Sequence, residues 1–224
     1  MPAPFDPPTV EMSAAEFDAE QQLYAGFTQS VRRLMSATLR TNADADEIRQ
    51  AQQVIDDISQ ALERDAIPGA FGVSLTNDGK LRGYGNAVTG LRNPLAVPLK
   101  IEWGQDTHVR ARFHLNGLYE GPPHTVHGGV IALVLDQLMG EAAAAGGHPG
   151  MTGTLKIRYE ANTPLGDCSG EAWTDRVEGV KSFVVGEIRN AAGERTVSAE
   201  GIFILPRWAR ESIAEGGRSP SRFE

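Results

Sequence analysis

One carboxylate in this sequence stands where a carboxylate is costly. Asp136 lies within residues 130–140, a run that otherwise reads as a helix with apolar residues on every side. Such a helix belongs inside a protein, and an ionised group there must be partnered or must serve the function. Two interpretations of Asp136 are open: a general base or nucleophile, or a side chain bonded to a neighbouring strand or to its twin across an interface.

Two adjacent glycines, Gly128 and Gly129, open this helix. The first N–H groups of a helix have no partner within it, and the helix dipole favours negative charge at that end. Because glycine lets a carbonyl approach the backbone closely, these amides are candidates for an oxyanion hole. The alternative is that the pair is only a flexible entry to the helix.

The spacing of these groups constrains how they act together. Gly128 and Asp136 are eight residues apart, which is about 12 Å along a helix at 1.5 Å per residue. A carbonyl under attack must lie about 3 Å from both the oxyanion donor and the catalytic group. If both residues act on one substrate, they most simply come from two chains. We therefore expect a homodimer, with a homotetramer as an open alternative.

The patterns around this helix predict an α+β fold. Residues 1–12 read as a disordered arm, residues 13–70 as a helical extension with a capping box at Ser13 and Glu16, and residues 207–224 as a flexible tail. Residues 71–206 form the main domain: an irregular connection, one or two strands, the apolar helix, and a meander of four alternating strands. We expect the antiparallel sheet of this domain to curl around the single apolar helix.

Composition excludes several classes of function. The 224 residues carry a formal net charge of −8, and no stretch concentrates lysine or arginine among aromatic residues, so nucleic acid is not an expected partner. No membrane span and no secretory signal is evident, and we expect a cytoplasmic protein. Cys168 is the single cysteine, without a basic neighbour, and a structural role is expected for it. We expect neither a metal nor a cofactor.

Several motifs together resemble one family. Residues 119–129 read YEGPPHTVHGG, and Asp136 follows nine residues after His127. Residues 151–159 and 163–166 read MTGTLKIRY and TPLG. From about residue 93 to residue 205 the chain resembles the hotdog-fold acyl-CoA thioesterases, in particular the PaaI-like branch and the branch of human thioesterase superfamily member 4. The resemblance implies a curved sheet wrapped around one helix and hydrolysis of an acyl-CoA to the acid and CoA.

The resemblance also implies roles for individual residues. Gly128 would polarise the thioester carbonyl, Asp136 would be the base or nucleophile, and Thr152 would orient the attacking water. His127 would hold the loop and support the oxyanion site, or would simply be a histidine satisfied by backbone groups. The positions expected to bind substrate are Gly129, Gly121, Lys181 and Arg158, with Lys156 and Arg189 as further candidates for the CoA phosphates. Some relatives carry an asparagine six residues before the histidine, where this chain has Gly121.

Two other functions fit the same fold. One is a hotdog module that binds acyl-CoA without turnover, although the presence of both Asp136 and Thr152 argues against it. The other is an acyl-thioester dehydratase or hydratase, which needs a catalytic histidine in a different motif; His127 is the one plausible histidine here. The acyl group itself is not indicated by any motif.

Overall fold

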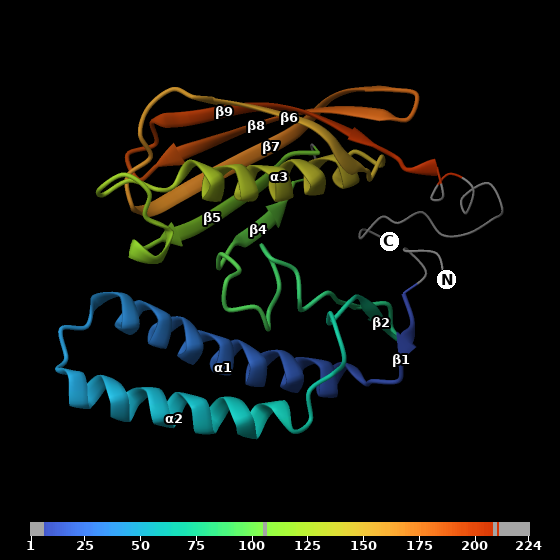
Figure 1. Ribbon diagram of the computed structural model, residues 1–224. Helices are drawn as coiled ribbons and strands as arrows, with labels where there is room; N and C mark the ends of the chain where they lie inside the picture. The colour runs from blue at the N-terminus through green and yellow to red at the C-terminus, as the bar shows by residue number, and fades with distance from the viewer. Residues whose placement is uncertain (1–6, 105–106, 208–209, 211–224) are drawn as a thin grey trace.

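The computed structural model describes residues 7–104, 107–207 and 210. In this part of the chain a six-stranded sheet curls around one helix, and two long helices form a separate layer below it (Figure 1). The elements in chain order are β1 (Thr9–Val10), α1 (Ala14–Arg40), α2 (Ala45–Glu63), β2 (Ser74–Thr76), β3 (Leu81–Arg82), β4 (Lys100–Trp103), β5 (Val109–Leu115), the 3-10 turn η1 (Gly117–Tyr119), α3 (Gly128–Ala145), β6 (Met151–Tyr159), β7 (Gly166–Glu178), β8 (Lys181–Asn190) and β9 (Arg195–Ile204).

The large sheet is antiparallel throughout, with the strand order β4-β5-β7-β8-β9-β6. The expected meander of four consecutive strands is therefore wrong in one respect. β7, β8 and β9 are consecutive neighbours, but β6 pairs with β9 at the far edge and not with β7. Side-chain alternation along a strand tells which face is buried, whereas it carries no information about which strand lies alongside.

The apolar helix α3 packs in the hollow of this sheet and forms the centre of the core. Leu135, Leu138 and Met139 are fully buried there. The sheet comes close to the helix because it presents glycines beneath it: a Cβ on Gly170 would lie 2.6 Å from Leu138, and one on Gly186 would lie 3.0 Å from Met139. Among the described residues, α3 is the one helix long and apolar enough to cross a membrane, and its place inside the sheet accounts for that composition.

One face of α3 is not covered by its own chain. Gly129 is exposed and Leu133 is 36% exposed, while Ala132, Asp136 and Gly140 are only partly buried. This is the small-residue face that carries Asp136. We expected α3 to need cover on every side. In a single chain, the side that carries Asp136 is not covered.

The two N-terminal helices begin at well-formed caps. Ser13 accepts a hydrogen bond from the Glu16 N–H, and the Glu16 carboxylate accepts one from the Ser13 N–H, which completes the expected capping box. Asp44 and Glu47 form a second capping box at the start of α2. α2 ends at Glu63, earlier than the expected end at residues 68–69. None of the residues of α2 is buried.

The N-terminal extension is attached to the rest of the chain by contacts between α1 and residues 82–96. Glu20 of α1 forms an ion pair with Arg82, Nη2 to Oε1 2.6 Å, and both side chains are largely buried. Arg32 donates hydrogen bonds to the carbonyls of Asn93, Pro94 and Ala96. A three-stranded sheet, β1-β2-β3, links residues on both sides of the boundary expected at residue 70.

The expected disorder at the N-terminus does not hold for all of the arm. Thr9 and Val10 form β1, which pairs in parallel with β2. Residues 1–6, and residues 208–209 and 211–224 of the expected flexible tail, lie outside the described residues.

Candidate active site

Asp136 has a specific partner on the sheet. The Thr152 hydroxyl, on β6, donates a hydrogen bond to Asp136 Oδ1 at 2.7 Å, and the pair is open to solvent on the uncovered face of α3. The bond from Asp136 to a neighbouring strand, which belongs to the second interpretation of this residue, is therefore present. That bond uses the proton of Thr152 and one carboxylate oxygen, so it leaves Asp136 Oδ2 and the lone pairs of the Thr152 oxygen as hydrogen-bond acceptors.

The other end of α3 presents one backbone donor. His127 is the N-cap, and its Nδ1 accepts the Gly129 N–H at 3.0 Å, so the neutral ring carries its proton on Nε2. The His127 carbonyl accepts from the N–H groups of Val130 and Ile131. In the described part of the chain, the Gly128 N–H has no acceptor and stands at the positive end of the helix dipole.

Tyr159, at the far end of β6, holds this helix end. Its hydroxyl donates to the Gly128 carbonyl at 2.8 Å. Thr152 and Tyr159 are seven residues apart, and strict alternation would put them on opposite faces of the sheet. A bulge between Thr152 and Thr154 adds one residue, Gly153, and returns both side chains to the face of α3. Alternation puts Tyr159 on the face of Leu155 and Ile157, and the bulge brings Thr152 to that face as well. We did not identify Tyr159 from the sequence, because no local pattern shows that its hydroxyl reaches the Gly128 carbonyl.

β6 is also an edge strand. It pairs with β9 on one side and with no described strand on the other. Its side chains are mostly exposed, among them Met151 at 59% and Tyr159 at 52%. An unpaired edge next to an uncovered helix face is a template for association with another chain.

Gly121 packs closely against the loop that leads into α3. A Cβ at this position would come within 2.7 Å of the His127 Cα, so no side chain fits without moving the loop. Its N–H donates to the Thr125 carbonyl within the turn that leads to His127. The structure brings Gly121, His127 and Gly128 together in the loop that opens α3.

The expected phosphate-binding cations do not lie with these residues. On β8, Ser182, Val184 and Ile188 are buried against the core, so Lys181 and Arg189 alternate onto the outer face of the sheet. On β6, Arg158 lies between residues that face α3 and therefore also points outward, as does Lys156, which pairs with Glu200. The structure separates all four cations from the face that carries Asp136 and Thr152.

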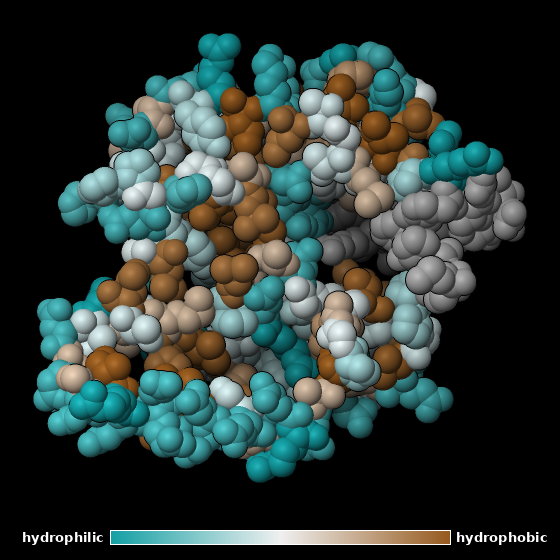
Figure 2. Space-filling view, in the orientation of Figure 1, coloured by the Kyte–Doolittle hydropathy of each residue, from teal (hydrophilic) through white to brown (hydrophobic). Residues whose placement is uncertain are grey.

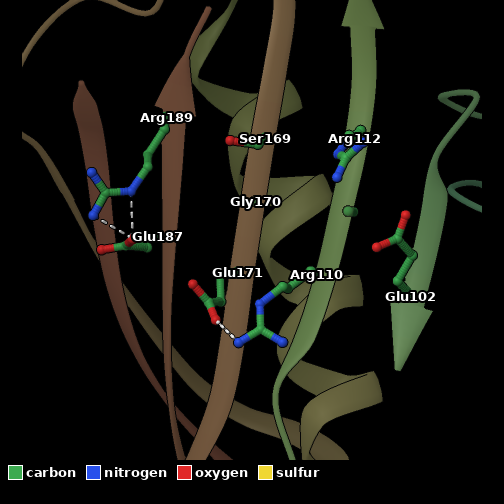
Figure 3. Close-up of a pocket in the computed structure, with 9 residues that line it drawn as sticks. Glu102, Arg110, Arg112, Ser169, Gly170, Glu171, Glu187 and Arg189 are labelled. Atoms are coloured by element: carbon green, nitrogen blue, oxygen red, sulfur yellow. Dashed lines mark hydrogen bonds and ion pairs between the residues drawn. The ribbon is translucent and has the colours of Figure 1, made fainter. Parts of the chain in front are cut away.

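Arg189 belongs to a shallow pocket on this outer face (Figure 3). The pocket has a volume of about 140 Å³. Its charges are largely compensated: Arg110 pairs with Glu171, and Arg189 with Glu187, each at 2.7 Å. Because the sheet lies between this pocket and α3, we do not include it in the site. The lining residues are Glu102, Arg110, Ala111, Arg112, Ser169, Gly170, Glu171, Glu187 and Arg189.

A larger hollow of about 770 Å³ lies between α1, residues 89–98 and β4. Figure 2 shows apolar side chains gathered in the middle of this face of the molecule. α3 contributes Glu141 to the lining, from the side of the helix that faces away from Asp136. β4 and β6 are opposite edges of the sheet, so this hollow is also distinct from the Asp136 site.

Cys168 is buried in the core on β7. Burial raises the pKa of its thiol to about 11, and the charge of Asp167 adds to this effect. The thiol is therefore protonated near neutral pH and is not a nucleophile, which agrees with the structural role expected from the sequence.

Comparison with known proteins places this geometry in a family. A model described as the thioesterase superfamily matches residues 124–197. A crystal structure of a thioesterase superfamily protein is 35% identical, covers 88% of this chain and 98% of its own, and has a TM-score of 0.71. Two weaker likenesses are to the Escherichia coli PaaI protein from the phenylacetic acid degradation operon, 13% identical, and to a Streptococcus mutans protein bound to acetyl CoA, 16% identical. These two cover 49% and 48% of this chain and 80% and 88% of their own, both with a TM-score of 0.46.

The curved sheet wrapped around one helix is a hotdog fold, as the sequence motifs indicated. The chain belongs to the thioesterase superfamily. The likeness to the first crystal structure includes the N-terminal extension, because it covers nearly nine-tenths of the chain.

Proposed function

We propose that this protein is an acyl-CoA thioesterase that hydrolyses its substrate to the free acid and CoA at two sites shared between the chains of a homodimer. The observation that carries the proposal is the Thr152–Asp136 pair, at 2.7 Å, on the open face of α3. This pair consists of a carboxylate and a hydroxyl that orients it, and it is open to solvent, so a ligand can reach it. Membership of the thioesterase superfamily supports the choice of a thioester as substrate.

The pair is suited to hold a water molecule for attack. Since Thr152 gives its proton to Asp136 Oδ1, the Asp136 Oδ2 atom and the Thr152 oxygen together can accept both protons of one water. A lone pair of that water is then directed away from the protein, toward a carbonyl carbon. The same carboxylate oxygen is also in place to attack the carbonyl directly, so the general-base and nucleophilic routes share one geometry.

A two-fold axis between two chains would bring the Gly128 N–H of one chain to the Asp136 of the other. The midpoint of Gly128 and Asp136 along α3 is Ala132, and the midpoint of Thr152 and Tyr159 along β6 lies between residues 155 and 156. A two-fold axis through these midpoints pairs the two β6 edges antiparallel and sets the two α3 helices antiparallel, with the small Ala132 at their crossing. Each Gly128 N–H then lies near the Asp136 of the other chain. This arrangement would cover the open face of α3.

The chemistry follows from these positions. The Gly128 N–H of one chain polarises the thioester carbonyl and stabilises the oxyanion that forms on it. In the other chain Asp136 takes a proton from water as the water oxygen bonds to the carbonyl carbon. The carbon–sulfur bond then breaks, and the CoA sulfur leaves with the proton that Asp136 returns. A thioester is reactive enough for one carboxylate and one aligned donor to suffice.

The test is hydrolysis of a panel of acyl-CoAs, with the CoA thiol detected by a disulfide reagent. We expect turnover of at least one acyl-CoA, and a loss of about 10²- to 10⁴-fold in kcat for Asp136→Asn, the usual contribution of a general base. Undiminished activity in Asp136→Asn would refute the mechanism. Tight binding of acyl-CoA with no hydrolysis on long incubation would show the binding module considered above, and a hydrated or dehydrated product would show the third alternative.

A further inference from the structure

We propose that Tyr159 is a positioning residue for the oxyanion donor: its hydroxyl fixes the Gly128 residue so that the free N–H holds one direction. This proposal rests on the proposed function and adds a residue to its site. Tyr159 lies on β6, seven residues from Thr152, and so one strand carries both the support of the carboxylate and the support of the donor.

The contact between Tyr159 and Gly128 is close and directional. The hydroxyl donates to the Gly128 carbonyl at 2.8 Å. The ring lies over the glycine, because a Cβ added to Gly128 would come within 3.3 Å of the ring Cζ and the hydroxyl oxygen. Tyr159 therefore restrains the peptide that follows the Gly128 Cα.

The peptide that precedes Gly128 is restrained from the helix. Its carbonyl, that of His127, accepts from the Val130 and Ile131 N–H groups at 2.9 and 3.3 Å. Gly128 is thus held on both sides, on one by the first turn of α3 and on the other by Tyr159. Glycine has the largest backbone freedom of any residue, and a donor that must not reorganise during the reaction needs such anchors.

Tyr159 contributes little to the core of a single chain. Tyr159 is 52% exposed, whereas the core beneath α3 is formed by fully buried aliphatic side chains such as Leu135 and Leu138. An exposed aromatic ring stabilises a single chain little. On the proposed two-fold axis the ring lies near Thr152 of the other chain, and so it also forms a wall of the site.

The experiment compares Tyr159→Phe with Tyr119→Phe in the full chain. Tyr119 is a matched control, because it lies in the turn before the same loop, on η1, and burial and the charge of Arg32, with no hydrogen bond, are what act on its hydroxyl in the described structure. We expect Tyr159→Phe to lower kcat about 3- to 10-fold, the effect of one hydrogen bond, with KM and Tm nearly unchanged. Tyr119→Phe should leave kcat within about twofold of wild type.

Binding of two CoA analogues separates positioning from folding. In a ketone analogue the sulfur is replaced by a methylene group and the carbonyl is kept; in a thioether analogue the carbonyl is absent. By titration calorimetry, Tyr159→Phe should weaken the ketone about 3- to 10-fold and leave the thioether unchanged. Equal weakening of both analogues, a kcat equal to wild type, or a loss of activity that follows a fall in Tm would overturn the proposal. If the wild-type protein hydrolyses no acyl-CoA, the proposed function fails, and the two analogues still test Tyr159.

Discussion

A mixed dimer tests whether one active site takes residues from two chains. The two variants are Asp136→Asn, which removes the carboxylate base, and Gly128→Pro, which removes the Gly128 N–H and also places a Cβ about 3.3 Å from the Tyr159 ring and hydroxyl. Proline suits this position because Gly128 is the first residue of α3 and His127 before it has φ −61° and ψ 130°, the extended conformation that precedes proline. Ala45→Pro makes the same change at the first residue of α2 and is the control for the proline itself.

The expected magnitudes follow from the arrangement. Loss of one oxyanion donor lowers kcat about 10²- to 10³-fold, so each homodimeric variant should retain no more than about 1% of the wild-type activity. In the proposed dimer each site takes one residue from each chain, because Gly128 and Asp136 of one chain are about 12 Å apart on the helix. A dimer of one Asp136→Asn chain and one Gly128→Pro chain then contains one intact site and one site with both defects. It should have about half of the wild-type activity per dimer, by that count of sites.

The assay uses co-expressed chains with two different affinity tags, purified on both in succession, so that only mixed dimers are measured. Recovery to about half of the wild-type kcat would support sites shared between chains. If each site were built within one chain, every site of the mixed dimer would keep one defect, and activity would stay near the level of the variants. That outcome, with Ala45→Pro fully active, would refute the two-chain site.

Two further predictions concern the fold. The Arg82 guanidinium that hydrogen-bonds Glu20 holds the pKa of this carboxyl below its ordinary 4.5; the ion pair therefore stabilises the protein fully above about pH 4.5 and ceases to do so as the pH falls through the lowered value. Urea unfolding should show Glu20→Gln to be less stable than wild type by about 2 kcal/mol at pH 7, and a difference that persisted undiminished at pH 3 would contradict this account. Since burial raises the pKa of Cys168 to about 11, iodoacetamide at pH 8 should modify it in urea and not in the native protein, as measured by mass spectrometry; rapid labelling of the native protein would show that the thiol is accessible.

Local sequence patterns determined much of this structure. The spacing of apolar residues predicts α3 and the alternating strands, and Ser13 with Glu16 predicts the start of α1, because helix periodicity, strand alternation and caps depend on residues close together in the chain. The same patterns identify Asp136 as a carboxylate on an otherwise apolar helix and Gly128 as the residue at its open end. The approximate position of the catalytic candidates could thus be derived without coordinates.

Only the tertiary structure decided which distant side chains meet. The pairing of β6 with β9 leaves β6 at an edge, and it depends on how the whole sheet closes around α3, which no local pattern encodes. One additional residue, Gly153, puts Thr152 and Tyr159 on the same face, whereas uninterrupted alternation puts Arg158 and Lys181 on the other. A shift of one residue reverses the face of every side chain beyond it, so strict alternation by itself could not put Thr152 and Tyr159 on one face of the sheet.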